Sequence, residues 1–181
     1  MNKQLHFNGG IKIIIFLFFI SILICTFQIS AQSWQWATKA NGKGNKIAVD
    51  SQGNSYVTGS FHGIAVFGGI TLISYGMDDI FVVKYNSSGI VQWANKAGST
   101  LSDAGRGIGV DGSGNVYVAG YYSEDTLNGS SATCIFSGTP IASAGSADVF
   151  LVKYNSSGVF QWVRKGGGLT FDYCDAMSVD D

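Results

Sequence analysis

Short apolar runs alternate with polar breaks along most of the chain. The runs are rich in β-branched and aromatic residues, for example "IAVD" at 47–50, "SYVTGS" at 55–60 and "IFVVKY" at 80–85. Strands favour these residue types. The breaks, such as "SQGN" and "NSSG", are typical of tight turns, because Gly and Asn tolerate the positive φ that such turns need. The pattern therefore predicts many short strands joined by hairpins.

The pattern also repeats. "KYNSSG" stands at 84–89 and again at 153–158, and the matching tryptophans Trp36, Trp93 and Trp162 are 57 and 69 residues apart. Each repeat reads as four strands, a to d, and the nearly continuous apolar runs of strands a and c are typical of sheets covered on both faces. We predict a β-propeller-like stack of four-stranded antiparallel blades, open rather than closed. The predicted units are a strand d at 34–40, one blade at 47–97, a second at 108–165, and a strand a of a further blade at 176–180.

The connections differ in length at one end of the strands only. The b–c connections hold about 18 and 26 residues and the d–a connections also vary, whereas the a–b and c–d turns are short. In an up-and-down sheet, the b–c and d–a connections share one rim, which we call the elaborated rim. The a–b and c–d turns share the other, the plain rim. Because loops on a rigid scaffold often carry function, we expect binding at the elaborated rim.

The first 31 residues differ from the rest. Lys3 and Lys12 precede an apolar run of 15 residues at 13–27, and a small residue, Ala31, follows. This order is typical of a secretory signal peptide, and a membrane-spanning helix needs about 20 residues. We predict a signal peptide at 1–31, an incomplete β-propeller at 32–181, and a secreted or cell-surface location, with no membrane span after signal removal.

Charge and composition narrow the function classes. After residue 31 the chain has 9 Lys/Arg and 12 Asp/Glu, and no basic run. Nothing in it therefore favours a nucleic-acid partner. The sequence predicts no catalytic, cofactor-binding or metal-ligating residues, and no cofactor.

The residues that repeat resemble a known family. "IAVDSQGNSYVTGSF", "DDIFVVKYNSSGIVQWA" and "IGVDGSGNVYVAGY" are similar to the SBBP-type β-propeller repeat of bacterial exported proteins. The resemblance implies a propeller of four-stranded blades and brings no agreed catalytic residues. Propellers usually hold about 4 to 8 blades, so two blades with partial neighbours suggest a fragment of a longer protein or one part of an assembly.

Three classes of function follow from this resemblance and from the residues. The first is a non-catalytic extracellular repeat scaffold or binding module for a protein or glycan ligand. The second is part of a propeller enzyme acting on glycans, with active-site residues in other blades. The third is a cation-stabilised adhesin. Because an open stack exposes apolar end faces, we also expect contact with the remaining blades of a longer chain, or self-association.

The polar candidates each have a structural interpretation. His62 is a single histidine in a loop, and no nucleophile-elbow pattern accompanies it. Asp50 and Asp111 fit turn chemistry better than a calcium loop, since further ligands are missing. Asp103 and Asp172, near Asp175, repeat at equivalent positions, which favours a role in the loop over acid–base chemistry.

The tryptophans and the Asn-x-Ser sequences each have a functional interpretation and an alternative to it. Trp36, Trp93 and Trp162 hold one fixed place in strand d, so packing between blades is favoured over sugar stacking. Three asparagines fit the Asn-x-Ser pattern, but this match is common by chance and the family that the chain resembles is bacterial: Asn86, Asn128 and Asn155.

Two cysteines follow the predicted signal peptide. Cys134 lies in the long b–c connection and Cys174 in the following d–a connection, so the topology places both on the elaborated rim. We expect a disulfide that closes a loop of about 40 residues and adds about 3 to 4 kcal/mol in the chain-entropy model. Two free thiols on one rim are the alternative.

Overall fold

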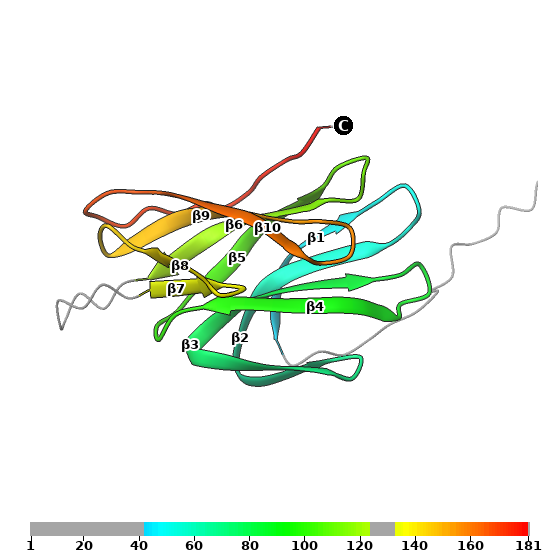
Figure 1. Ribbon diagram of the computed structural model, residues 1–181, viewed down its shortest axis with the longest axis horizontal. Coiled ribbons are helices and arrows are strands. Elements are labelled where there is room, and N and C mark those ends of the chain that lie inside the picture. Colours follow the sequence, from blue (N-terminus) through cyan, green and yellow to red (C-terminus); the bar gives the residue numbers. More distant parts are fainter. Residues whose placement is uncertain (1–41, 124–132, 181) are drawn as a thin grey trace, which may run out of the picture. The chain divides into compact units, whose positions relative to one another are not determined.

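The computed structural model describes residues 42–123 and 133–180 of the 181-residue chain. These residues form ten strands in two antiparallel sheets, and they lie within one compact unit, Trp36–Asp181. Neither sheet closes on itself (Figure 1). The predicted fold class, an open propeller-like stack of antiparallel blades, is confirmed. The strand predicted at 34–40 lies outside the described residues.

The first blade, blade 1, consists of β1 (Lys43–Val49), β2 (Ser55–Phe67), β3 (Ile70–Tyr85) and β4 (Val91–Gly98), which pair in that order. Blade 2 repeats this arrangement with β5 (Ala104–Val110), β6 (Val116–Ser123), β9 (Ala147–Tyr154) and β10 (Phe160–Gly166). The repeat extends to the irregularities of the sheets. A register shift lies between Gly44 and Lys46 in blade 1, and an equivalent one lies between Gly105 and Gly107 in blade 2.

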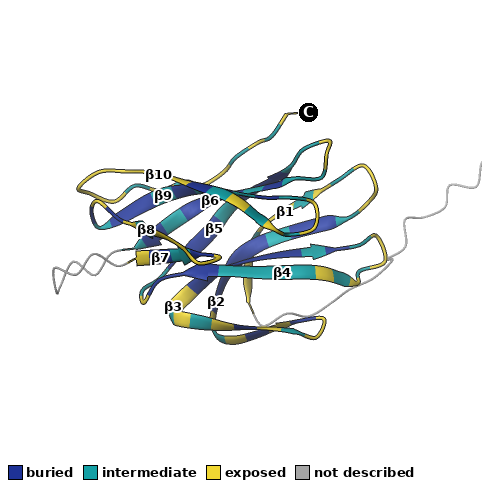
Figure 2. Cartoon of the chain, viewed as in Figure 1, coloured by how far each residue is buried: buried dark blue, intermediate teal, exposed yellow. Residues whose placement is uncertain are grey.

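The main core lies between the two blades, where Figure 2 shows buried residues on both sheets. Blade 1 contributes one face of β3, through Ile80 and Val82, and blade 2 contributes the opposite face of β9. On β9 these residues are Phe150, Val152 and Tyr154, each no more than 2% exposed. Alternation along a strand sends neighbouring side chains to opposite faces, so strand c of each blade presents one apolar row to each side.

The b–c connection of blade 1 is more ordered than the sequence predicted. We expected an irregular loop of about 18 residues, but β2 and β3 continue as one long hairpin and turn at Gly68 and Gly69. Both glycines have positive φ, 53° and 95°, which this two-residue turn requires. The prediction of a loop is wrong here because the alternating apolar residues beyond His62 continue the strand pattern.

The b–c connection of blade 2 also contains a hairpin, formed by β7 (Thr133–Phe136) and β8 (Thr139–Ala142). This hairpin does not extend its own blade. It pairs antiparallel with β4, so that Ala97 faces Phe136 and Gly98 faces Ile135. Blade 1 therefore becomes a six-stranded sheet whose last two strands come from blade 2.

Residues 176–180, predicted as a strand, form no strand in the structure. They nevertheless lie where the repeat places them, against β5. A Cβ added at Gly107 would meet Met177, and one added at Gly109 would meet Val179. None of the described strands pairs with this segment, and a β-ladder needs a partner strand, which explains why no strand forms. None of the described residues forms a helix with the length and apolar character that a membrane crossing requires.

Candidate binding surfaces at the two rims

The a–b turns of the plain rim are held by their aspartates. Asp50 Oδ1 accepts hydrogen bonds from the amides of Gln52 and Asn54, and Oδ2 accepts from Asn54 Nδ2 and from the Tyr56 hydroxyl. Burial raises the pKa of Asp50, but these donors outweigh it and hold the pKa below its ordinary value. Asp111 makes the same bonds in blade 2: Ser113, Asn115 and Tyr117. The turn interpretation of Asp50 and Asp111 agrees with these contacts.

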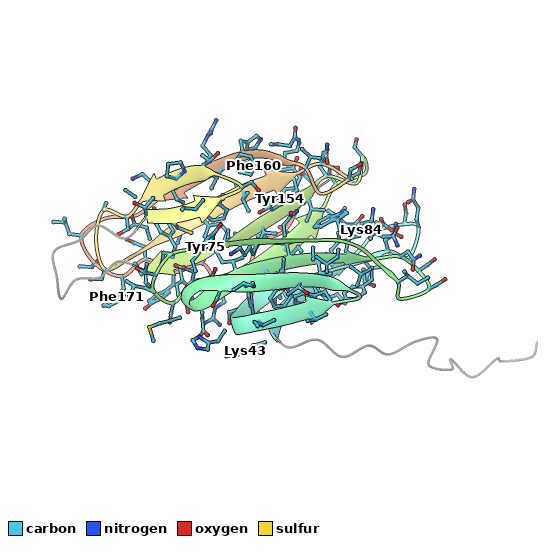
Figure 3. The ribbon with its side chains drawn as sticks, turned by 60° about the horizontal axis from the view of Figure 1, so that its bottom comes forward. Lys43, Tyr75, Lys84, Tyr154, Phe160 and Phe171 are labelled. Carbon is cyan, nitrogen blue, oxygen red and sulfur yellow. The ribbon has the colours of Figure 1, made fainter. Side chains whose placement is uncertain are left out.

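The lysine of "KYNSSG" packs on the tyrosine that holds this turn. Lys84 Nζ lies 5.2 Å from the centre of the Tyr56 ring, and Lys153 Nζ lies 4.9 Å from the centre of the Tyr117 ring. An ammonium group over an aromatic face is attracted by the negative face of the ring. At the plain rim of each blade, a lysine therefore packs on the tyrosine whose hydroxyl bonds to the turn aspartate. This contact accounts for the repeated lysine, of which Figure 3 labels Lys84.

Side chains of blade 1 donate hydrogen bonds to the backbone of the c–d turn of blade 2. The Ser156 carbonyl accepts bonds from Lys84 Nζ at 3.4 Å and Trp93 Nε1 at 3.2 Å, and the Gly158 carbonyl accepts one from Asn95 Nδ2 at 2.7 Å. Gly158 has a positive φ of 79°, and a Cβ there would lie 2.6 Å from the Trp93 indole. The Asn-Ser-Ser-Gly turn is thus a contact between blades as well as a hairpin turn.

Replacing Asn95 by alanine should lower the free energy of unfolding by about 1 kcal/mol, because the buried side of the Gly158 carbonyl loses its donor. Urea denaturation of the variant and the wild type measures the difference. Gln92→Ala is the matched control, since Gln92 is exposed and its side-chain amide donates to the Ile90 carbonyl in its own turn. If both variants lost the same free energy of unfolding, the hydrogen bond from Asn95 to Gly158 would not stabilise the contact between the blades.

A polar groove lies between the two a–b turns. It has a volume of about 480 Å³, and its lining includes Asp50, Gln52, Tyr56, Lys84, Asp111 and Ser156. A similar groove of about 500 Å³ lies between the Asp111 turn and the segment at 177–180. One groove therefore occurs per blade junction on the plain rim, where the sequence predicted only turns.

Two aspartates of the elaborated rim accept hydrogen bonds from the loops that contain them, and one of the two is buried. Asp103 is fully buried and accepts bonds from the amide and hydroxyl of Ser99 and the amide of Ser123. Asp172 repeats the first contact by accepting from the Gly168 amide. These bonds agree with the loop role that the sequence favoured, whereas Asp175 is exposed.

Sequence reasoning missed a second pair of aspartates, Asp79 and Asp148. They are 0% and 1% exposed, and each accepts a bond from the backbone amide four residues earlier, at Tyr75 and Ala144. Desolvation raises the pKa of Asp79 to about 6 and that of Asp103 to about 7, despite these donors. The repeated "D-[IV]-F" could have identified the pair from the sequence. Among the described residues, no three His, Cys, Asp or Glu side chains gather as a metal site.

The remaining candidates lie apart from one another. His62 lies within β2 and not in a loop as the sequence suggested; it is exposed, and its Nδ1 lies 2.6 Å from the Met77 carbonyl. Trp93 packs between Tyr56 and Tyr154, with ring centres 6.3 Å from each. Trp162 lies 6.2 Å from Tyr117. Trp36 and Asn128 lie outside the described residues, and the other two sequon asparagines accept amide bonds within their turns: Asn86 and Asn155.

The two cysteines are free thiols in the structure. Cys134 is buried in β7 within the core between the blades, and burial raises the pKa of its thiol well above the ordinary value. Cys174 is partly exposed, and its Sγ donates to the Ala176 carbonyl. The expected disulfide is not formed here, and its formation under oxidising conditions stays a prediction.

The outer face of the β2–β3 hairpin is apolar and exposed. Ile64 and Ile73 pair across the hairpin and are each 59% exposed, and Val66 lies on the same face. Tyr75 and Met77 continue the row along β3, at 52% and 55%. Lys96 Nζ lies 3.4 Å from the centre of the Tyr75 ring (labelled in Figure 3) and bonds to the Ile73 carbonyl. We call these five side chains the outer hairpin patch.

The geometry above defines a class: an open stack of four-stranded antiparallel blades related by an internal repeat. Two segments, residues 37–60 and 92–121, match the family model described as the SBBP beta-propeller repeat. In the described residues, the first match covers β1 and the start of β2, and the second covers most of β4, all of β5 and most of β6. These matches support the predicted repeat family.

A curated protein is also similar to the chain. It is named "Uncharacterized WD repeat-containing protein L264", from Acanthamoeba polyphaga mimivirus, and it is 28% identical over 154 residues. The alignment covers 70% of this chain but 11% of that protein, so the chain spans about a tenth of the length of this relative. Together, the family matches and this relative indicate a repeat scaffold of the propeller kind.

Proposed function

We propose that the chain is a non-catalytic repeat scaffold, secreted or held at the cell surface, that binds a protein partner. The observation that carries this proposal is the outer hairpin patch, a row of five apolar side chains about half exposed to solvent. Contiguous exposed apolar surface often marks a protein interaction site, and aromatic residues and methionine are enriched in such sites. The export that we infer from the apolar run at 13–27 is part of the same proposal.

The buried and turn carboxylates support a scaffold over the two alternatives. Asp50, Asp111 and Asp103 are each engaged by several local donors, and these bonds fix the rims that a scaffold must present. A glycan-cleaving enzyme needs two carboxylates that face a substrate across a cleft. Such a pair would have to include residues of further blades, as the sequence suggested.

The proposal is tested by comparing partners of the wild type with those of Ile64→Ser/Ile73→Ser, which makes the patch polar without changing the buried face. Exported protein of the source cell is passed over each immobilised chain, and bound proteins are identified by mass spectrometry. We expect at least one protein that the wild type retains and the patch variant loses. Gln92→Ala, which changes an exposed residue outside the patch, should retain it. Identical sets of bound proteins for all three chains would overturn the proposal.

Calcium separates the scaffold from a cation-stabilised adhesin. The oxygens of Asp50 and Asp111 already accept bonds from their own turns, so an added cation would have to displace these donors. We expect the melting temperature to change by less than about 1 °C when millimolar calcium replaces EDTA, because a ligand stabilises only when it binds the native state. Differential scanning fluorimetry measures this, and a rise of several degrees would favour the adhesin.

A further inference from the structure

Among the described residues, strand c of blade 1 is packed on both faces, whereas the far face of strand c in blade 2 borders a groove shared with residues 174–178. In β3, Ile80 and Val82 are buried against blade 2, and the alternate residues Phe81, Val83 and Tyr85 are buried on the far side. In β9, the far-side residues are the half-buried Val149 and Leu151. Among the described residues, the far face of strand c is therefore capped in blade 1 and only partly covered in blade 2.

The β2–β3 hairpin covers this far face of blade 1. Beyond Phe61 it folds back over blade 1, as Figure 1 shows below β4, and its inner face carries Ala65, Phe67 and Leu72. These side chains are 0%, 1% and 8% exposed, and the Phe67 ring lies 4.9 Å from the Phe81 ring. The turn of the hairpin reaches the first residue of β4, because a Cβ added at Gly68 would meet Val91.

The internal repeat identifies what this face would otherwise bind. Phe81 and Phe150 are equivalent: each lies across from a glycine of strand b, Gly59 or Gly120. In blade 2 the row that begins with Phe150 is covered by Ile80 and Val82 of blade 1. The hairpin covers the equivalent row in blade 1, so it occupies the place of a preceding blade.

We propose that the β2–β3 hairpin beyond Phe61 is an end cap that keeps a second copy of the chain from stacking on blade 1. The second copy is the expected occupant because Val149 and Leu151 of its blade 2 are the repeat equivalents of Ile80 and Val82. The junction between blades 1 and 2 shows how these two surfaces fit once residues 176–180 of the second copy leave β5, where they hold the place of the next strand a. Without the cap, copies would join head to tail, and such heterologous contacts continue without a defined end unless they close into a ring. This inference concerns the inner face of the hairpin and does not depend on the proposed binding function.

The test compares mean mass by sedimentation velocity for chains that begin at Trp36, the first residue of the compact unit. Leu72→Asp places a carboxylate under the cap and should release it. The matched control is Thr71→Asp, which adds the same charge to the adjacent exposed position. A second variant replaces residues 64–75 with Asn-Gly, which removes the cap without burying a charge.

We expect both capless chains to reach a mean mass at least about three-fold above the wild type, rising with concentration, while Thr71→Asp stays at the wild-type mass. Adding Leu151→Asp to either capless chain should return the mass to the wild-type value, because it blocks the far face of strand c in blade 2. Aggregation from simple unfolding would not be reversed by a further polar substitution. A capless chain with the wild-type mass, or a gain in mass that Leu151→Asp leaves unchanged, would overturn the proposal.

Discussion

Lowering the pH from about 8 to about 5 should raise the melting temperature of the two-blade unit by about 10 °C, or about 3 kcal/mol in the free energy of unfolding. Burial raises the pKa of Asp103 to about 7 and that of Asp79 to about 6, from an ordinary value of 3.8. A carboxyl group with a raised pKa in the folded state binds its proton more tightly there than in the unfolded chain. Its contribution to stability is therefore full below about pH 4 and is lost as the pH rises through 6 and 7.

The groups around Asp103 act in the same direction. Asp79 and Cys134 lie close enough to interact with Asp103 electrostatically. The charges of Asp103 and Asp148 also raise the pKa of Tyr122. No cation is among the groups that shift the pKa of Asp103. Lys96 offsets part of the charge of Asp79, whereas negative charge at Asp103 above pH 7 is poorly compensated.

Thermal unfolding across this pH range tests the prediction. Asp103→Asn should flatten the dependence, since the variant has no proton to lose at this position. Asp172→Asn should preserve it, because Asp172 holds the equivalent place in the next repeat but is partly exposed. A melting temperature that rises from pH 5 to pH 8 would show that the sign is wrong.

Phe150→Ala should cost about 3 to 5 kcal/mol, which is a large part of the stability of a unit of this size. Phe150 is 2% exposed, and the centre of its ring lies 4.9 Å from that of Phe136, a residue of the β7–β8 hairpin that packs in the core. A Cβ at Gly120 would lie 2.9 Å from the same ring, so the cavity is enclosed and cannot collapse freely. Removing the ring should weaken the junction of the blades and the docking of the hairpin together.

Urea denaturation with tryptophan fluorescence measures the loss. Phe171→Ala is the matched control, because Phe171 is 62% exposed and should cost less than about 1 kcal/mol. If Phe150→Ala were as mild as its control, the core between the blades would not be the main source of stability.

The strand order and the turns could be predicted because they depend on local chemistry that repeats. "DSQGN" and "DGSGN" satisfy their own backbone amides, so Asp50 and Asp111 form the same turn in both blades. The hairpin beyond Phe61 was harder to predict. Its alternation of Ile64, Ala65, Val66 and Phe67 follows a Gly-containing bulge, and only contact with Phe81 decides which face is buried.

The buried aspartates and the pairing of β7 with β4 depend on contacts far apart in the sequence. Nothing near Asp79 indicates that Gly98 leaves room for its carboxylate, although a Cβ there would lie 2.3 Å from Cγ. The sequence placed Cys134 on the elaborated rim but gave no sign that it lies in β7 within the core between the blades, whereas its pairing with Cys174 stays a prediction.

Lys84, Trp93 and Asn95 hydrogen-bond to the next blade in a way that bears on whether blades can be exchanged between proteins. These side chains bind carbonyl oxygens of Ser156 and Gly158, groups that every residue type carries. The receiving blade is therefore recognised by the path of its backbone, apart from the glycine that the indole requires. A blade taken from another protein should seat against blade 1 if its turn has this length and this glycine, whatever its other turn residues.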